Sequence, residues 1–122
     1  IVLNNRDLNM VTWEQRILAG EPKFEASQDI PDIPYASFAQ LLGLKGIRVE
    51  NPEDINQALR SALHADRPTI LDILVDPNVP ITPSHISMET MHKFSKALLK
   101  GDPEQSGIIR QTIKEIMQGG MA

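Results

Sequence analysis

The stretch TILDILV, from Thr69 to Val75, decides the fold of this chain. Its apolar residues occupy neighbouring positions, so a strand built from it is apolar on both faces. Strands of this kind usually lie inside a parallel sheet that helices cover. Asp72 interrupts the run. We expect it near a helix N-terminus or in partial contact with solvent, because a buried carboxylate needs hydrogen-bond partners.

The segments just before this strand predict a helix and, ahead of it, a second strand. Residues 51–65, NPEDINQALRSALHA, offer Asn51 as an N-cap and Pro52 at the first helical position. Residues 46–50, GIRVE, form a short run with β-branched residues, which is typical of a strand.

The same alternation extends to the N-terminus. A helix is expected over residues 35–42, with Asp32 as its cap and Gly43 as its stop. Ile1 to Leu3 is apolar and predicts a buried strand, after which a short helix ends near Gly20. The residues expected on one apolar face of that helix are Met10, Val11, Trp13, Ile17 and Leu18.

The order strand, helix, strand, helix, strand predicts an α/β fold, a doubly wound parallel sheet with flanking helices and right-handed crossovers. Three strands are few for a sheet that is covered on both faces. The strand at Ile1 would lie near an edge although it reads as buried. We therefore expect the domain to continue upstream of Ile1.

A proline-rich segment, DPNVPITPSHIS at residues 76–87, leads out of the last strand. Two further helices are expected, over about 88–100 and 103–118. We divide the chain into part of one domain, residues 1–81, and a C-terminal helical tail, residues 82–122. The caps and stops expected for the two tail helices are Ser87, Gly101, Asp102 and Gly119.

Composition excludes several classes of function. The chain has 122 residues, a formal net charge of -4 and no cysteine. Thiolate metal sites and cysteine nucleophiles are therefore excluded, and nucleic acid is not an expected partner because no face collects Lys and Arg. The lack of cysteine fits a reducing compartment, and we expect the cytoplasm.

The segment NNRDLN, residues 4–9, follows the first predicted strand and is the best candidate for a site. In open parallel sheets, ligands bind beyond the carboxyl ends of the strands. Asparagine and backbone carbonyl oxygens are hard ligands that suit Mg²⁺. The alternative is that these asparagines only form a turn, as they often do without any ligand.

The stretch LNNRDLNMVTWEQ, residues 3–15, resembles the second half of the thiamine-diphosphate binding motif, which runs from a Gly-Asp-Gly to an Asn-Asn at a strand end. The resemblance continues through FAQLLGLKGIRVENPEDINQALRSAL, residues 38–63, and RPTILDILVDPNVPI, residues 67–81. The tail ITPSHISMETMHKFSKALLKGD, residues 81–102, looks most like the pyruvate oxidases and quinone-linked pyruvate dehydrogenases. The chain thus resembles thiamine-diphosphate-dependent enzymes of the pyruvate oxidase and acetolactate synthase group.

This resemblance implies a metal site and a cofactor site. Asn5 matches the asparagine whose side-chain oxygen binds Mg²⁺, and Asp7 matches the residue that gives its backbone carbonyl to the same ion. Asn9 stands where the family usually has glycine, so we expect it at positive φ. The resemblance also places Met10 and Val11 beside the cofactor and substrate, and it counts Asn5, Asp7, Leu8 and Asn9 with them as cofactor-binding residues. Glu14 matches a catalytic glutamate near the reacting centre of pyruvate oxidases.

The implied function is part of a thiamine-diphosphate- and Mg²⁺-dependent enzyme that oxidatively decarboxylates a 2-oxo acid such as pyruvate. An FAD, where one is used, would be bound by a domain outside this chain, and the parent enzyme would be a homo-oligomer, a dimer or tetramer. We expect the isolated chain to be inactive. The alternatives are an acetolactate synthase-type carboligase or another 2-oxo acid decarboxylase, and a non-catalytic α/β dimerisation module.

The remaining distinctive residues fit structural roles better. Trp13 is expected in the core or a subunit interface. The three histidines lack zinc-type spacing and predict surface or capping positions. The last helix has few cations on its polar face, so we expect it to pack against protein and do not expect a peripheral membrane contact. The apolar side of that helix is predicted from Ile109, Ile113, Ile116 and Met117.

Overall fold

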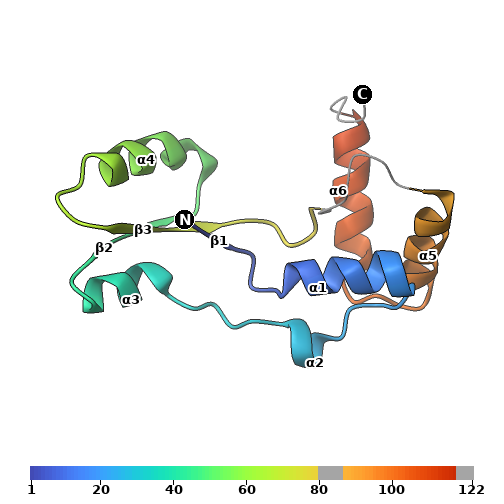
Figure 1. Ribbon diagram of the computed structural model, residues 1–122. Helices are drawn as coiled ribbons and strands as arrows, with labels where there is room; N and C mark the ends of the chain where they lie inside the picture. The colour runs from blue at the N-terminus through green and yellow to red at the C-terminus, as the bar shows by residue number, and fades with distance from the viewer. Residues whose placement is uncertain (80–86, 118–122) are drawn as a thin grey trace. The chain divides into compact units, whose positions relative to one another are not determined.

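The computed structural model describes residues 1–79 and 87–117, without the side chains of 115–117. The chain forms two compact units, each described here by itself (Figure 1). Unit 1 contains residues 1–6 and 30–76, and unit 2 contains residues 7–29 and the chain from Pro77 onwards. The division at residue 81 stays a prediction.

Unit 1 contains a parallel sheet of three strands, β1 (Val2–Asn4), β2 (Lys45–Val49) and β3 (Thr69–Leu74). The strand order is β1-β3-β2, so the stretch that predicted a buried parallel strand is the central one. Asp72 on β3 is in register with Val2 on one side and Arg48 on the other.

Helices cover both faces of this sheet, as Figure 1 shows for α3 (Tyr35–Leu41) and α4 (Ile55–Leu63), the latter preceded by the short helix η2 (Pro52–Asp54). The doubly wound α/β prediction is therefore confirmed. Burial of apolar surface between helix and sheet is the main stabilising contribution here. The residues of this core are Val49, Ala58 and Leu71, with Ile47, Ile55, Leu59, Ala62 and Ile73 packed against them.

Small residues let α3 lie close to β2. Ala36 and Ala39 are buried on α3, and a Cβ added at Gly46 of β2 would lie only 1.8 Å from the Ala36 carbonyl oxygen. No rotamer change could relieve that clash, because it would be with backbone. Glycine at position 46 is thus required by packing.

Two expectations for unit 1 are corrected. Asp32 does not cap α3; Pro34 holds the N-cap position, and the Asp32 carboxylate pairs with arginines instead. The apolar start of the chain is not buried, since Ile1 and Leu3 are 76% and 66% exposed. The reason is that strand side chains point to the faces of the sheet, and α3 and α4 pack against β2 and β3.

Unit 2 begins with helix α1 (Asn9–Glu14), which continues as the π-helix η1 (Gln15–Ala19) and ends at Gly20 with φ of 67°. A short helix α2 (Glu25–Gln28) follows, and α5 (Met88–Leu99) and α6 (Gln105–Met117) come later in the chain. Ser87 caps α5 as predicted, because its Oγ accepts a hydrogen bond from the Thr90 amide at 3.1 Å. Gly119 lies outside the described residues.

The predicted apolar face of α1 is wrong. Trp13 is buried, but Met10, Val11 and Leu18 are exposed. The buried positions of α1 and η1 are instead Asn9, Thr12, Trp13 and Arg16, a helical stripe that is mostly polar. Trp13 lies against Phe94, with ring centroids 5.8 Å apart, and below the Arg16 guanidinium. Its expected core position is confirmed.

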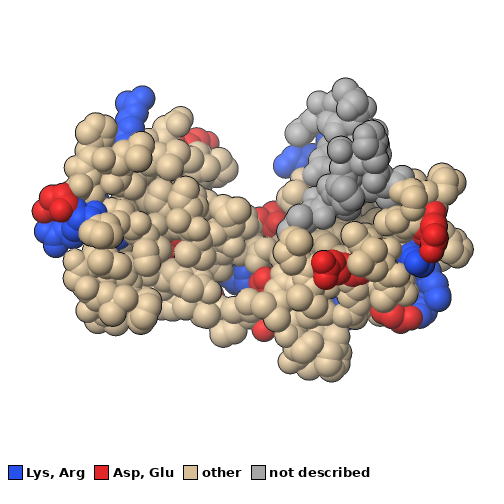
Figure 2. All heavy atoms as spheres, in the orientation of Figure 1, with Lys and Arg blue, Asp and Glu red and all other residues tan. Residues whose placement is uncertain are grey.

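The surface and the last helix add two observations. Figure 2 shows both basic and acidic side chains on the visible face of each unit. In α6 the buried isoleucine is Ile108, while Ile109 and Ile113 of the predicted stripe are 44% and 51% exposed. The side chains of Ile116 and Met117, and all of His85, lie outside the described residues. No helix in the described ranges is long and apolar enough to cross a membrane.

Candidate functional site

The carboxyl end of β1 is fixed by the side chain of Asn4. It is 5% exposed, and its Nδ2 donates to Asp72 Oδ1 at 3.0 Å and to Asp32 Oδ1 at 3.3 Å. Asn5, the predicted metal ligand, follows directly and is half-buried. These contacts give Asn4 a structural role at the strand end.

Arg48 completes this polar cluster of unit 1. Its guanidinium holds Asp32 through two bonds of 3.0 and 2.9 Å and donates to Asp72 Oδ2 at 3.2 Å. Hydrogen bonding from Arg48 lowers the pKa of Asp32. Asp72 is completely buried, so the expectation of partial solvent contact is wrong. It is tolerated inside the sheet because Asn4 and Arg48 supply the partners that a buried carboxylate needs.

The chain turns at Arg6, which adopts a left-handed φ of 57°. The expectation of positive φ at Asn9 is wrong, because Asn9 is the first residue of α1. Its side chain donates to Asp7 Oδ2 at 3.2 Å and to the Pro77 carbonyl at 3.0 Å, which ties it into the buried interior of unit 2. The sequence therefore placed the polar turn correctly. It assigned the positive φ to Asn9, whereas Arg6 adopts it.

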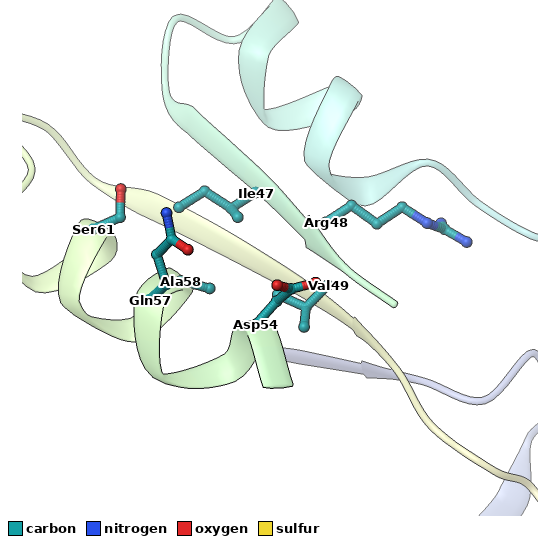
Figure 3. A pocket seen from close by; sticks show the side chains of 7 residues that line it. All are labelled: Ile47, Arg48, Val49, Asp54, Gln57, Ala58 and Ser61. Atoms are coloured by element: carbon teal, nitrogen blue, oxygen red, sulfur yellow. The ribbon is translucent and has the colours of Figure 1, made fainter. Parts of the chain in front are cut away.

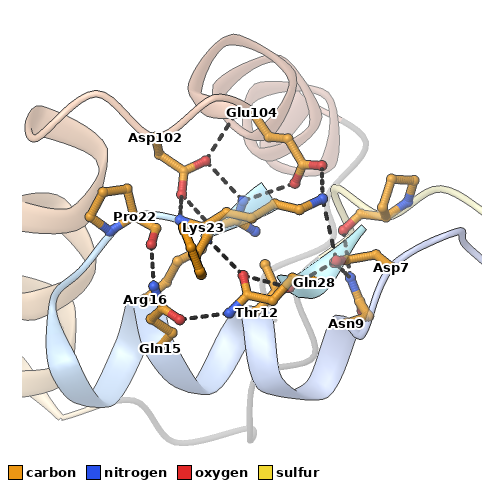
Figure 4. Close-up of polar contacts among 12 residues, drawn as sticks. Asp7, Asn9, Thr12, Gln15, Arg16, Pro22, Lys23, Gln28, Asp102 and Glu104 are labelled. Atoms are coloured by element: carbon orange, nitrogen blue, oxygen red, sulfur yellow. Dashed lines mark hydrogen bonds and ion pairs between the residues drawn. The ribbon is translucent and has the colours of Figure 1, made fainter. Parts of the chain in front are cut away.

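Asp7 lies two residues before the start of α1 and is only 5% exposed. Its carboxylate accepts from Thr12 Oγ at 2.9 Å and from Asn9, and it lies 3.3 Å from the Lys23 ammonium (Figure 4). The carboxylate is thus engaged within unit 2. This fits a metal-binding role through the backbone carbonyl, since that role does not require the side chain.

Lys23 is the cation that neutralises Asp7. Its ammonium lies 2.7 Å from Asp29 and 2.8 Å from Glu104, and its side chain is 4% exposed. Burial by itself lowers the pKa of Lys23, but hydrogen bonds to Asp29 and Glu104 raise it above its ordinary value. Lys23 is therefore charged at any physiological pH.

Arg16 is the second buried cation of unit 2. Its Nε and Nη2 donate to the two carboxylate oxygens of Asp102, each at 2.8 Å, and Nη2 also donates to Glu104 at 2.8 Å. The side chains of Arg16 and Asp102 are fully buried. Burial raises the pKa of Asp102, yet the bonds from Arg16 and from the backbone amides of Lys23 and Glu104 together leave the pKa below its ordinary value.

The opposite face of the same helix is open. Met10 and Val11 are 58% and 49% exposed, and Glu14 and Leu18 are exposed on the same side of the helix. Leu8, just before the helix, is 44% exposed. Of the predicted site residues, Met10, Val11 and the catalytic candidate Glu14 thus share one accessible face. The side chains of Asp7 and Asn9, which were also predicted to bind the cofactor, face the buried network instead.

Sequence reasoning did not find the polar residues that make up or contact the buried face of α1 and η1. These are Thr12, Arg16, Lys23, Asp102 and Glu104. A signal was present, because residues 9, 12, 13 and 16 have the spacing of one helical face. It was missed because only apolar residues were considered as candidates for burial.

The donors offered for a metal are neutral oxygens. No group of three or more His, Asp or Glu side chains in the described ranges could hold an ion. The predicted pair, the Asn5 side-chain oxygen and the Asp7 carbonyl, are hard donors of the kind Mg²⁺ takes, and this ion commonly completes its shell with water and phosphate oxygens. The residues therefore fit a magnesium ion that is bound together with a phosphorylated ligand.

Unit 1 also has an open groove of about 280 Å³ between β2 and α4 (Figure 3). None of the predicted site residues lines it. The lining residues are Ile47, Arg48, Val49, Asp54, Gln57, Ala58 and Ser61.

Comparison with known proteins agrees with the resemblance to thiamine-diphosphate-dependent enzymes. A family described as the C-terminal TPP binding domain of thiamine pyrophosphate enzymes matches residues 1–73. The putative thiamine pyrophosphate-containing protein YdaP of Bacillus subtilis (strain 168) is 30% identical over 118 residues, which are 97% of this chain and 20% of that protein.

Two further relatives are acetolactate synthases. The mitochondrial catalytic subunit of Saccharomyces cerevisiae is 31% identical over 104 residues, covering 85% of this chain and 14% of that protein. The probable large subunit of Methanococcus aeolicus is 35% identical over 78 residues, covering 63% of this chain and 13% of that protein. The chain spans a fifth or less of the length of these relatives.

Proposed function

The chain belongs to the thiamine pyrophosphate enzymes, within their C-terminal TPP-binding domain, and we propose that it serves an enzyme that decarboxylates 2-oxo acids such as pyruvate. The similarity to YdaP supports a thiamine pyrophosphate-containing protein for the region beyond residue 73 as well, because it extends over 97% of the chain. Thiamine pyrophosphate and thiamine diphosphate are the same cofactor.

The exposed face of α1 is the observation that carries the proposal. Met10 and Val11 form an accessible apolar surface, and the Glu14 carboxylate stands beside it. Binding sites for small ligands combine apolar walls with a few placed polar groups. In this proposal Met10 and Val11 exclude water from the cofactor, and Glu14 holds or moves a proton at the reacting centre.

The diphosphate end of the cofactor would be held through Mg²⁺. We assign the side-chain oxygen of Asn5 and the backbone carbonyl of Asp7 as its protein ligands, with Leu8 and Asn9 bordering the site. Bound thiamine diphosphate supplies a nucleophilic carbon and an electron sink for decarboxylation. The chain's own contributions are the hard oxygen donors, the apolar face and the Glu14 carboxylate.

Two reaction types are in competition. An oxidative decarboxylation of pyruvate is favoured by Glu14 and by the resemblance of the tail. An acetolactate synthase reaction is favoured by the names of several relatives. In either case we propose a homo-oligomeric cytoplasmic enzyme, and an FAD would be held by another domain.

Product analysis on the intact protein that carries this chain separates these reactions. With thiamine diphosphate, Mg²⁺ and pyruvate, acetate or acetyl phosphate indicates the oxidase type, and acetolactate indicates the synthase type. Failure to bind thiamine diphosphate in isothermal titration calorimetry would overturn the proposal and favour a non-catalytic module. The isolated chain of 122 residues is expected to show no turnover.

The role of Glu14 is tested by Glu14→Gln in the intact protein. We expect kcat to fall by about 100-fold, the typical loss for a group that handles a proton, while the Kd for thiamine diphosphate changes little. The matched control is Glu25→Gln, because Glu25 is exposed on α2 in the same unit. Equal activity of the two variants would exclude Glu14 from catalysis.

A further inference from the structure

The short segment between α5 and α6 sends two carboxylates, Asp102 and Glu104, into the interior of unit 2. It lies beyond residue 73, where the family match ends. Its contacts are nevertheless with the segment that carries the candidate residues. Figure 4 shows both carboxylates among the side chains that line the buried face of α1 and η1.

Asp102 fills all of its acceptor positions. Oδ2 accepts from Arg16 Nε at 2.8 Å and from the Lys23 amide at 2.9 Å, and Oδ1 accepts from Arg16 Nη2 at 2.8 Å and the Glu104 amide at 2.9 Å. An ionised carboxylate has about four such positions. A bidentate pair with arginine fixes orientation as well as distance. Asp102 therefore holds η1, through Arg16, in one rotational setting.

Glu104 reaches the other end of the helical segment. Its Oε1 accepts from the Lys23 ammonium at 2.8 Å, and that ammonium lies 3.3 Å from Asp7. Asp7 in turn accepts from Thr12 Oγ at 2.9 Å, inside α1. Glu104 thus acts on Asp7 through Lys23, near the start of α1, and shares Arg16 of η1 with Asp102.

The candidate residues of the open helix face lie between Asp7 and Arg16 in the chain. Met10, Val11 and Glu14 are exposed, so nothing described on their own face fixes the helix. A rotation of the helix would turn all three away together, because they share one face. Groups behind a site set its geometry in this way when they lock the residues that touch the ligand.

We propose that Asp102 and Glu104 are positioning residues of the cofactor site, which set the rotation of α1 through Arg16 and through Lys23 and Asp7. This inference rests on the proposed function. Residues 102–104 thus support the cofactor site, although they lie far in sequence from the residues that form it.

The test measures thiamine diphosphate binding in the intact protein at fixed Mg²⁺, by isothermal titration calorimetry, for Asp102→Asn and Glu104→Gln. We expect the Kd to rise by about 10-fold in each variant, as is typical when a supporting group behind a ligand-binding residue is lost. The control is Glu89→Gln, which removes the same charge from an exposed pair with Lys93 on α5 and should leave the Kd unchanged.

The measurement is made well below the melting temperature of each variant, where circular dichroism shows complete folding. A purely structural role would lower the melting temperature but leave the Kd of the folded protein as in wild type, and that result overturns the inference. Should Asp102→Asn not fold, Glu104→Gln decides, because Glu104 is partly exposed. A wild-type protein that binds no thiamine diphosphate overturns the proposed function first.

Discussion

Two helical segments, one in each unit of this chain, differ in the chemistry of the face that they bury. In unit 1 the sheet and α4 enclose Val49, Ala58 and Leu71, an apolar core. In unit 2 the buried face of α1 and η1 carries Thr12 and Arg16, with Trp13 between them, and charged partners meet it. Both solutions remove the helix face from water, but they tolerate change differently.

The stabilising free energy of an apolar core falls in proportion to the atoms removed. The stability of a buried charge cluster, in contrast, depends on every member of the cluster. Each ion in the interior has lost its hydration, and only its partners replace that loss. Removing one partner leaves the others uncompensated. Unit 2 should therefore be the more sensitive to single substitutions at its buried polar positions.

The largest effect is expected for Arg16→Met, which leaves Asp102 and part of Glu104 buried without their main cation. The free energy of unfolding should fall by about 3–5 kcal/mol, measured by urea denaturation. The double variant Arg16→Met/Asp102→Leu should recover most of this loss, because both charges are gone. A double variant less stable than the single one would contradict the comparison.

A smaller effect is expected for Leu71→Ala, at the centre of the sheet in unit 1, where Leu71 is 3% exposed. The cavity and the lost apolar burial should cost about 3 kcal/mol in the same urea experiment. Leu63→Ala is the matched control, because Leu63 is 81% exposed at the end of α4. Equal losses in the two variants would show that this core contributes little.

The smallest effect is the pH dependence that Asp102 gives to unit 2. Its pKa is lowered in the folded state, so its contribution is complete above the unfolded value of about 3.9 and is lost as pH falls through the folded pKa. Urea denaturation between pH 6 and about pH 3 should show stability falling below pH 4. Asp102→Asn should flatten this slope, whereas Leu71→Ala should keep it and shift the whole curve down.

Much of unit 1 could be predicted from the sequence because its signals are local. Apolar periodicity located β2, β3 and α4, and the apolar run on β3 identified the parallel sheet. A motif of neighbouring residues predicts the candidate site in the turn after β1. The buried Asp72 could not be predicted, since its partners Asn4 and Arg48 are brought to it by strand register.

Unit 2 shows where local reasoning fails. The apolar residues Met10, Val11 and Leu18 predicted the buried face of α1, and they are the exposed ones. A helix buries whichever face its surroundings can satisfy. Here those surroundings include Asp102 and Glu104, which are more than 80 residues away along the chain from Arg16.

The sequence by itself determined the α/β fold, the family and the segment that carries the candidate site, because these depend on periodicity and on short motifs. Only the tertiary structure decided which face of α1 is open and which residues hold it. The physical reason is that a charged side chain can be buried only where its partners lie, and those partners come together through folding.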